Sequence, residues 1–313
     1  MAAINYAAEY AQALAQAYPN VLHFGALYAT ENNGRYRMGE NGKSVYIPRI
    51  KTSGRVDSNR DSLVQAKRNF DNSWELKPLT HQRQWNTLVH PMDIQQTNDV
   101  ASIQNITQVF NETQKFPEMD AYLISQLYKL WTTKDANDAD DKAMTADTTK
   151  LTEANVLSVF DNLMEKMDEA LVPATGRILY VTSTTHKLLK QAEGIVREMS
   201  VQQGGSNVSR IINRLDEVEI VSVPTTLMKT AYDFDEGWAV DDENAQQINM
   251  FLVHPTAVIT PVSYEFAQLD APSATTNGKY YYFEESFEDV FILNKRKGAL
   301  QFNVTAAAGG SGN

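Results

Sequence analysis

The longest hydrophobic pattern in the chain lies between Met92 and Thr133 and predicts two helices. Thr97 or Asn98 can cap the first helix, whose apolar residues recur at helical spacings along one face: Val100, Ile103, Ile106, Val109 and Phe110. Pro117 interrupts this helix and suits the first turn of the next, whose apolar face is formed by Met119, Tyr122, Leu123, Leu127, Leu130 and Trp131. We expect these helices to carry the fold.

Shorter patterns precede the central helices. Residues 3–17 predict a helix with a thin apolar stripe, mostly alanine, which needs another surface to lean on. Turn signals at 32–34 and 39–42 follow, and Ser44–Ile50 then reads as a strand with alternating apolar positions. Pro48 suits an edge strand or an isolated ribbon because it cannot donate a ladder hydrogen bond. The polar, basic stretch from 51 to 76 predicts a projecting arm.

The second half of the chain alternates between helical and strand patterns. Residues 135–150 form a polar stretch, which predicts a linker and a domain boundary at this place. The alternation itself predicts an α/β or α+β domain. The expected helices begin at Thr152 and at Ser183 or Thr184, the latter running to about Met199, and the expected strands are Arg177–Val181, Leu215–Val223, Ile248–Val253 and Ala257–Val262. Two later strands, Tyr280–Phe283 and Val290–Leu293, are expected to return toward the first half.

Length and composition indicate an ordinary globular chain. Its 313 residues, 42% of them hydrophobic, suffice for about two domains with a proper core. The sequence has neither an apolar run of about 18 residues nor a basic segment before its Ala-rich start, so it predicts neither a membrane span nor a signal peptide. The chain has no cysteine, which excludes disulfides, thiolate metal sites and cysteine nucleophiles.

The charge of the chain is unevenly distributed. A net charge of −11 argues against a general nucleic-acid binder, which needs an excess of Lys and Arg to displace phosphate counterions. From residue 35 to residue 83, however, eleven basic residues face five acidic ones. Acidic residues gather instead at 135–153 and 233–243. These regions are either solvated faces or surfaces at which copies of the chain meet.

No constellation of residues predicts catalysis. The GENGKS segment lacks the first glycine of a phosphate-binding loop, because that position is Arg37, and a strand rather than a helix follows it; we interpret it as a hairpin turn. The five histidines show no metal-ligand spacing, and the acidic stretch from Asp233 lacks the glycine and final glutamate of a calcium loop. We therefore predict no catalytic residue, no metal site and no cofactor.

The order of the motifs along nearly the whole chain resembles that of the major capsid proteins of tailed bacteriophages with the Hong Kong 97-type fold. The resemblance rests on ALYAT, the basic projection with SVYIPRI and KTSGRVDSNRD, the MDIQQTND segment before the long helix, FPEMDAYLISQLY, PATGRILYVTSTTHKLL, EIVSVP, INMFLVHPTAV and YYYFEESFEDVFILNKRKGAL. Each motif alone is a weak structural fragment. Their order and spacing carry the resemblance.

The resemblance implies an α+β fold with four parts. These are an N-terminal arm at 1–33, an extended β-hairpin loop at 34–80, a peripheral domain with a long spine helix at 81–149 and 266–313, and an axial α/β domain at 150–265. In that family the subunits form hexamers and pentamers, and the extended loop lies across a neighbour. We hypothesise that basic residues of this region contact an acidic neighbour: Arg35, Arg37, Arg49, Lys51, Arg55, Arg60, Lys67 and Arg68.

The resemblance also implies partners and a location. The expected product is a non-enzymatic, self-assembling icosahedral shell that encloses double-stranded DNA without sequence-specific binding and is built in the bacterial host cytoplasm. Because only some thirty residues precede the loop, we expect a separate scaffolding protein, with a portal and a possible decoration protein. Two alternatives stay open. An encapsulin-type compartment shares the fold and stores enzyme cargo, and a soluble hydrolase lacks any supporting motif here.

Overall fold

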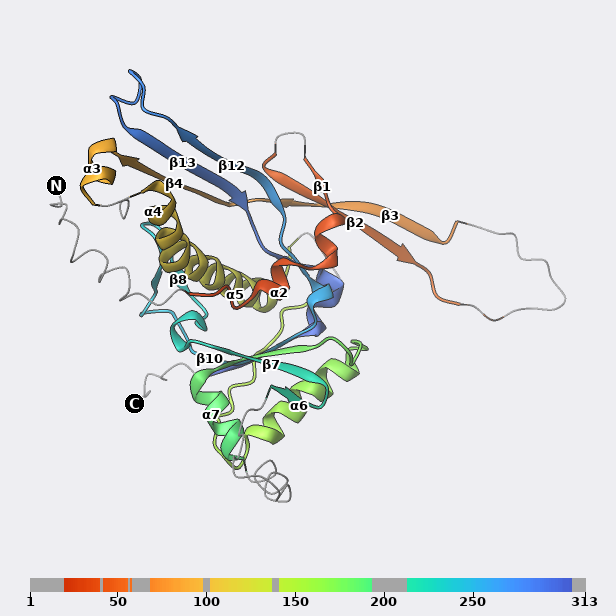
Figure 1. Cartoon of the computed structure of the whole chain (residues 1–313). Coiled ribbons are helices and arrows are strands. Elements are labelled where there is room, and N and C mark those ends of the chain that lie inside the picture. Colours follow the sequence, from red (N-terminus) through yellow and green to blue (C-terminus); the bar gives the residue numbers. More distant parts are fainter. Residues whose placement is uncertain are drawn as a thin grey trace, which may run out of the picture.

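The computed structural model describes residues 20–39, 42–55, 57, 68–97, 102–136, 141–192 and 213–305. A long helix crosses the middle of the molecule, a five-stranded sheet with two helices lies below it, and a three-stranded sheet lies above it (Figure 1). A two-stranded ribbon projects from the side. The helix predicted at 3–17 falls outside the described residues.

The two predicted central helices are one continuous helix, so the predicted interruption at Pro117 is wrong. It consists of α4 (Ile103–Phe110), a π-helical turn η2 (Asn111–Lys115) and α5 (Phe116–Thr132). In the π turn the Phe116 N–H donates to the Asn111 carbonyl, five residues back. This wider pairing lets the helix pass the proline, which has no N–H and crowds the carbonyl four residues before it. We call Ile103–Thr132 the spine helix.

The start of the spine helix also differs from the prediction. A short helix, α3 (Pro91–Gln96), ends before Thr97, and the spine helix begins at Ile103. Ser102 caps it, because its Oγ accepts a hydrogen bond from the Asn105 N–H at 3.4 Å. The capping residue was therefore misplaced by a few positions in the sequence prediction.

A mixed five-stranded sheet forms the lower body. Its strand order is β15-β10-β5-β7-β6, in which only the β5–β7 pair is parallel. The strands are β5 (Ile178–Thr182), β6 (Arg214–Leu215), β7 (Val218–Val223), β10 (Ile248–Val253) and β15 (Leu300–Val304). The helices α6 (Val156–Glu169) and α7 (Ser183–Gln191) lie below this sheet (Figure 1). The predicted extension of α7 toward Met199 falls outside the described residues.

One predicted strand of this sheet is a hairpin. The pattern at Leu215–Val223 predicts a single strand, but β6 and β7 pair antiparallel around Asp216 and Glu217. Both turn residues have positive φ angles, 48° and 67°. Positive φ angles at both positions are typical of a two-residue hairpin turn. Such a turn is easier to predict from an Asn-Gly pair than from two acidic residues.

The core lies between the spine helix and the five-stranded sheet. Tyr180, Phe251 and Phe302 are directly opposite one another on β5, β10 and β15, so they form an aromatic row on one face of the sheet. Trp131 of the spine helix packs on Phe302 with ring centroids 5.0 Å apart, and Phe24 of the N-terminal segment packs on Tyr180 at 4.6 Å. The edge strand β15 thereby belongs to this sheet, although the sequence grouped it with the central helices.

An antiparallel sheet covers the other side of the spine helix. Its order is β12-β13-β4, with β4 (His81–Val89), β12 (Val262–Asp270) and β13 (Tyr280–Glu288). The predicted return of the Tyr280 segment to the first half is confirmed, because β13 pairs with β4 over nine residues. Trp85 of β4 stacks on Phe110 of the spine helix at 3.9 Å.

The third sheet builds the projection. Its order is β1-β2-β3, with β1 (Arg37–Met38), β2 (Ser44–Thr52) and β3 (Phe70–Pro78). The predicted hairpin turn at 39–44 is confirmed, since β1 pairs antiparallel with β2. The remaining short elements are α2 (Gly25–Tyr28), η1 (Glu31–Gly34), η3 (Thr225–Leu227), β8 (Tyr232–Asp233), β9 (Ala239–Val240), η4 (Pro255–Ala257), β11 (Val258–Ile259), β14 (Phe291–Ile292) and η5 (Asn294–Ala299).

One close approach between η5 and α6 predicts a measurable effect on stability. A Cβ at Gly298 would lie 2.6 Å from the Cβ of Ala170, so Gly298→Ala forces the two segments apart. We expect a loss of about 1–3 kcal/mol in the free energy of unfolding, measured by urea titration. Gly54→Ala is the matched control, because no atom lies within 4 Å of its Cβ position. Equal effects of the two changes would contradict the packing.

Candidate inter-subunit surface

The ribbon formed by β2 and β3 is anchored at its base by a small hydrophobic cluster. Val45 and Ile47 of β2 are buried there with Leu79, Ile259 and Phe291. The two strands pair over nine residues, from Ser44 opposite Pro78 to Thr52 opposite Phe70. Beyond the cluster, the outer half of the ribbon projects from the body of the molecule (Figure 1). Pro48 lies where β1 no longer pairs with β2, so its missing N–H leaves no ladder bond unmade there.

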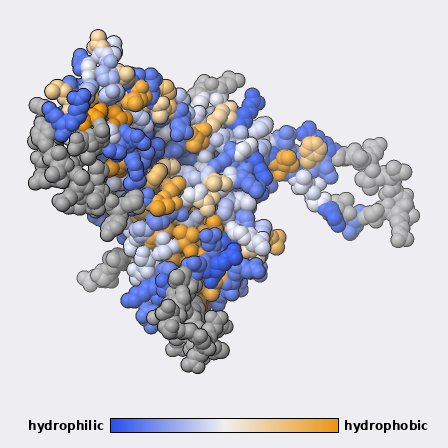
Figure 2. Space-filling view, in the orientation of Figure 1, coloured by the Kyte–Doolittle hydropathy of each residue, from blue (hydrophilic) through white to orange (hydrophobic). Residues whose placement is uncertain are grey.

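Alternation along the two strands gives the ribbon one apolar face. The register places Pro48 opposite Trp74 and Tyr46 opposite Leu76, and the same face continues to Ile50 and Phe70. Four large side chains on it are strongly exposed: Ile50 at 66%, Phe70 at 52%, Trp74 at 53% and Leu76 at 53%. The ribbon shows hydrophobic side chains at its surface in Figure 2. We call Pro48, Ile50, Phe70, Trp74 and Leu76 the apolar ribbon face.

The basic residues that the sequence singles out are spread along the same region. Arg35 lies 3.9 Å from Glu31 near the base, and Arg37 is exposed on β1. Arg49 and Lys51 lie on the ribbon face opposite the apolar one, Arg49 half-buried and Lys51 exposed. Arg55 is exposed, and the guanidinium of Arg68 lies over the Phe70 ring at 4.9 Å. Arg60 and Lys67 fall outside the described residues.

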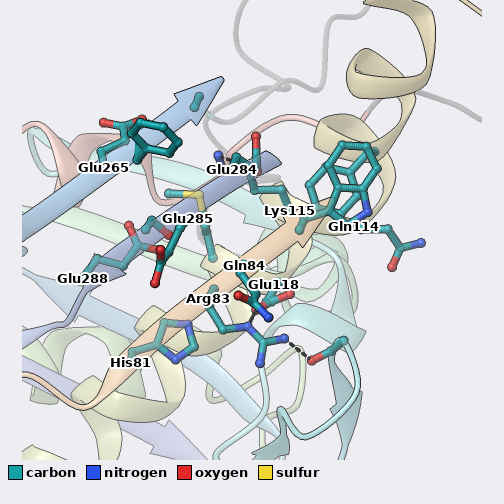
Figure 3. Close-up of a pocket in the computed structure, with 17 residues that line it drawn as sticks. His81, Arg83, Gln84, Gln114, Lys115, Glu118, Glu265, Glu284, Glu285 and Glu288 are labelled. Carbon is teal, nitrogen blue, oxygen red and sulfur yellow. Dashed lines mark hydrogen bonds and ion pairs between the residues drawn. The ribbon is translucent and has the colours of Figure 1, made fainter. Parts of the chain in front are cut away.

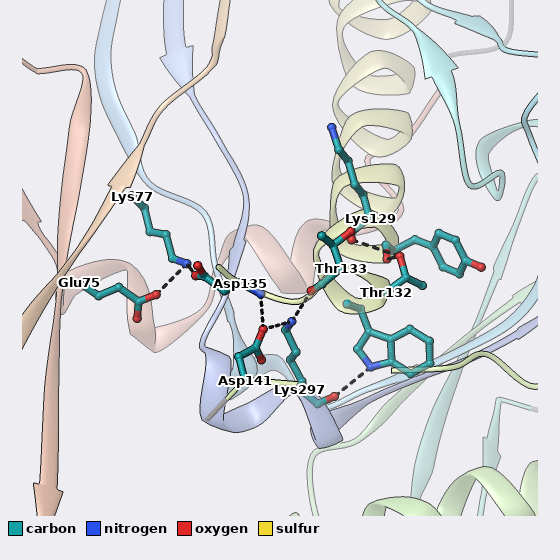
Figure 4. A network of polar contacts seen from close by, with 10 residues as sticks. Glu75, Lys77, Lys129, Thr132, Thr133, Asp135, Asp141 and Lys297 are labelled. Carbon is teal, nitrogen blue, oxygen red and sulfur yellow. Dashed lines mark hydrogen bonds and ion pairs between the residues drawn. The ribbon is translucent and has the colours of Figure 1, made fainter. Parts of the chain in front are cut away.

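A polar network ties the inner end of the ribbon to the spine helix. Lys77 pairs with Glu75 at 2.7 Å and with Asp135, and these hydrogen bonds outweigh the effect of burial, so the pKa of Lys77 is raised. The Asp135 N–H donates to Asp141 at 2.7 Å (Figure 4). Asp141 in turn pairs with Lys297 at 2.6 Å, both of them buried. The ribbon base is therefore positioned by the end of the spine helix and by η5.

The buried Lys297 has hydrogen-bond partners on several sides. Its Nζ donates to the Thr133 carbonyl at 2.8 Å as well as to Asp141, and its own carbonyl accepts a hydrogen bond from Trp131 Nε1 at 3.1 Å (Figure 4). A buried charge is tolerated only when it is paired and hydrogen-bonded in this way. The network explains why the spine helix ends where it does, next to the ribbon.

An acidic cleft of about 210 Å³ lies between the spine helix and the sheet β12-β13-β4. Its carboxylates come from the helix and two strands: Glu118, Glu265, Glu284, Glu285 and Glu288 (Figure 3). Two cations balance part of this charge, since Arg83 pairs with Glu118 at 2.5 Å and Lys115 with Glu284 at 3.2 Å. The cleft therefore keeps an excess of carboxylates over cations.

Burial changes the ionisation of two cleft residues. Burial raises the pKa of Glu288. The negative charges of Glu118, Glu265 and Asp289 raise this pKa further, and the positive charge of Lys115 lowers it. Burial also raises the pKa of Glu118, although Arg83 opposes it. Both carboxyl groups thus hold their protons to higher pH than an exposed glutamate does.

The acidic segment 233–243 borders this cleft. Arg83 reaches out of the cleft and donates to the carbonyls of Phe234 at 2.6 Å and Gly237 at 3.0 Å. Asp233, Asp235 and Glu236 are exposed on the same segment. The acidic stretch predicted near 233 therefore joins the cleft glutamates in one acidic surface.

A second buried carboxylate fixes the N-terminal segment on the spine helix. Asp120 is 0% exposed and accepts hydrogen bonds from the backbone N–H groups of His23 at 2.9 Å and Phe24 at 3.1 Å. It thereby fixes the two residues that precede α2, whose N-cap residue Phe24 makes no side-chain cap of its own. Burial raises the pKa of Asp120 to about 7, against the opposing effect of these two hydrogen bonds.

Among the described residues no group of three or more metal-binding side chains converges, and no helix is long and apolar enough to cross a membrane. His81 is stacked on Tyr122 at 3.6 Å, and burial, together with Arg83, lowers its pKa to about 4. His81 is therefore neutral at physiological pH, and its imidazole packs as an aromatic ring.

Sequence reasoning missed the apolar ribbon face and the cleft. The segment Phe70–Pro78 alternates between the two faces, but Asn72 breaks the apolar series and the segment was counted as polar. The run FEESFED contains three of the five cleft glutamates, yet their partners on the spine helix and β12 are distant in sequence. Only pairing of β13 with β4 and β12 brings them together.

Solved structures show which fold this chain has. The chain of the bacteriophage PhiM1 mature capsid matches with a TM-score of 0.64 at 13% identity, over 87% of this chain and 85% of that one. The capsid of the cyanophage P-SCSP1u matches at 0.62 and 13% identity over 93% and 90%, and a Mycobacterium phage Che8 structure at 0.60 and 12% over 92% of each chain. No family model and no curated protein matches the sequence. The chain has the α+β, Hong Kong 97-type fold of these phage capsid chains.

Proposed function

We propose that this chain is the structural, non-enzymatic subunit of an icosahedral bacteriophage shell. The observation that carries the proposal is the likeness in fold to phage capsid chains over about nine tenths of both chains. The projecting ribbon supports it, because an isolated two-stranded ribbon with an exposed apolar face is marginally stable until something covers that face. In a shell of identical subunits a neighbouring copy covers it.

The four-part division predicted from the sequence belongs to this proposal. The N-terminal arm is 1–33, the extended loop 34–80, the peripheral domain 81–149 with 266–313, and the axial domain 150–265. We modify it in one place, because β15 pairs with β10 and so extends the axial sheet. The ribbon then acts as the extended loop, and it lies across the next subunit in hexamers and pentamers.

The proposed partners follow from the same assignment. Copies of the chain assemble in the host cytoplasm with a separate scaffolding protein, a portal and a possible decoration protein, and the shell encloses DNA without reading its sequence. An encapsulin-type compartment is the competing assignment within this fold. DNA inside particles purified from infected cells supports the phage shell, and enzyme cargo without DNA supports the compartment.

The basic residues of the extended loop provide a prediction of the effect of charge on assembly. If Arg49, Arg55 and Arg60 face acidic surface on a neighbour, then changing all three to glutamate weakens assembly, because like charges then meet. The wild-type assembly midpoint should shift with salt concentration, and the variant should lose most of that dependence. Light scattering across a salt series measures both. Unchanged assembly and an unchanged salt dependence would overturn the charge pairing.

A further inference from the structure

The N-terminal half of the spine helix has an apolar side that the described part of the chain leaves incompletely covered. None of the residues of α4 is buried, although Ile103, Ile106, Val109 and Phe110 form an apolar stripe. An open groove of about 530 Å³ runs along an adjoining side of this helix and shares only Ile103 with the stripe, since Phe110 is stacked on Trp85 of β4. The other lining residues are Gln104, Thr107, Gln108, Asn111, Glu112, Phe116, Leu269 and Tyr282.

A buried polar atom in the same groove also lacks a partner. Asn111 lines the groove, and its Oδ1 is buried but accepts no hydrogen bond from any residue that the structure describes. Leaving a buried acceptor unpaired is costly, so such an atom indicates a donor that comes from elsewhere. This observation is independent of the apolar lining.

The path of the N-terminal segment leads into this groove. Phe24 N–H is bound to Asp120, and Asn20 N–H donates to the Glu112 carbonyl at 3.3 Å. Moving from residue 24 to residue 20, the chain therefore advances along the spine helix from Asp120 toward Glu112, which is itself a groove residue. Asn20, the first residue that the structure describes, therefore lies at the groove.

The sequence of those residues fits the groove in length and shape. The predicted apolar stripe of residues 4–15 would be about 17 Å long as a helix, and the lining residues from 103 to 116 extend over about 20 Å of the spine helix. The stripe is mostly alanine, and small side chains let two helices approach closely. A thin stripe that cannot support a helix alone is stabilised by such a groove.

We propose that residues 1–19 bind in cis in the groove along α4 and η2 of their own subunit, with the stripe Ile4, Ala7, Ala8, Ala11, Leu14 and Ala15 against Ile103, Thr107 and Phe116. This inference does not rest on the shell function, because it concerns a contact within one chain. It assigns a role to the apolar stripe that the sequence singles out.

The absence of cysteine in the chain makes cross-linking a direct test. The variant Ala11→Cys with Thr107→Cys is treated, as unassembled full-length protein, with a short bis-maleimide and separated on a denaturing gel. We expect an internally linked monomer of altered mobility. The control Ala11→Cys with Lys129→Cys places the second thiol about 33 Å further along the same helix and should remain unlinked.

Two further variants separate binding of the stripe from chance encounters. Leu14→Glu puts a charge on the stripe and should lower the yield of internal links several-fold, whereas Ala13→Glu, on the opposite side of the predicted helix, should leave the yield unchanged. Linked dimers in place of linked monomers would overturn binding in cis and assign the groove to a neighbouring copy. Absence of any link at Thr107→Cys, or equal yields for the two glutamate variants, would overturn the proposal altogether.

Discussion

Trp74→Glu should prevent shell formation while leaving the subunit folded. Trp74 is the largest side chain of the apolar ribbon face and lies with about half of its surface exposed in the single chain. If a neighbour buries it, each contact gains roughly 1.5–3 kcal/mol from this residue, and a glutamate there buries a charge without a partner. Sedimentation velocity should show subunits or capsomers in place of particles.

Ser73→Glu is the matched control for this change. Ser73 neighbours Trp74 on β3 but lies on the opposite face of the ribbon, and it is exposed as well. The free energy of unfolding, measured by thermal melting, should be the same for both variants within about 0.5 kcal/mol, because both residues are exposed in the single subunit. If Trp74→Glu assembles as the wild type does, or if Ser73→Glu blocks assembly equally, then the apolar face is not the contact.

Asp120→Asn should remove a large pH dependence of stability. Burial raises the pKa of Asp120 to about 7 in the folded state, against 3.8 for an ordinary aspartate. Between these pH values the folded chain holds a proton that the unfolded chain has released. The contribution of Asp120 to the free energy of unfolding is therefore fully present below about pH 4 and falls as the pH rises to about 7. Above pH 7 it stays constant, at about 4 kcal/mol below its value at low pH.

Urea titration of wild type and variant from pH 4 to pH 8 measures this contribution as a difference curve. Asp147→Asn is the control with the opposite sign, since hydrogen bonds from Thr149 and Asn303 outweigh the effect of burial and lower the pKa of Asp147. Its stabilising contribution is present at neutral pH and is lost as the pH falls. A flat difference curve for Asp120→Asn would show that folding does not raise the pKa of Asp120.

The sequence predicts most of the architecture because long periodic segments signal their own structure. The strands Ser44–Ile50 and Ile248–Val253 and the return of the Tyr280 segment are all found in the structure. Single residues that signal the ends of helices were a less reliable guide. Pro117 indicates a break, but the π turn before it keeps the spine helix continuous, and this compensation depends on tertiary packing that no local pattern carries.

The candidate surface was only half predictable for a related reason. Charge is visible in the sequence, so the basic loop and the acidic stretch near 233 could be identified. The apolar ribbon face required pairing of two strands separated by seventeen residues, because only their register puts Ile50 and Trp74 on one side. The cleft glutamates of β12 and β13 likewise meet only through the pairing of these two strands.

Electron cryomicroscopy of particles assembled from the purified chain tests the central claim most directly. The proposed function predicts closed icosahedral shells of hexamers and pentamers, in which the ribbon lies across the next subunit and Pro48, Ile50, Phe70, Trp74 and Leu76 are buried at the contact. Particles without hexamers and pentamers, or particles whose ribbons extend into solvent, would contradict it.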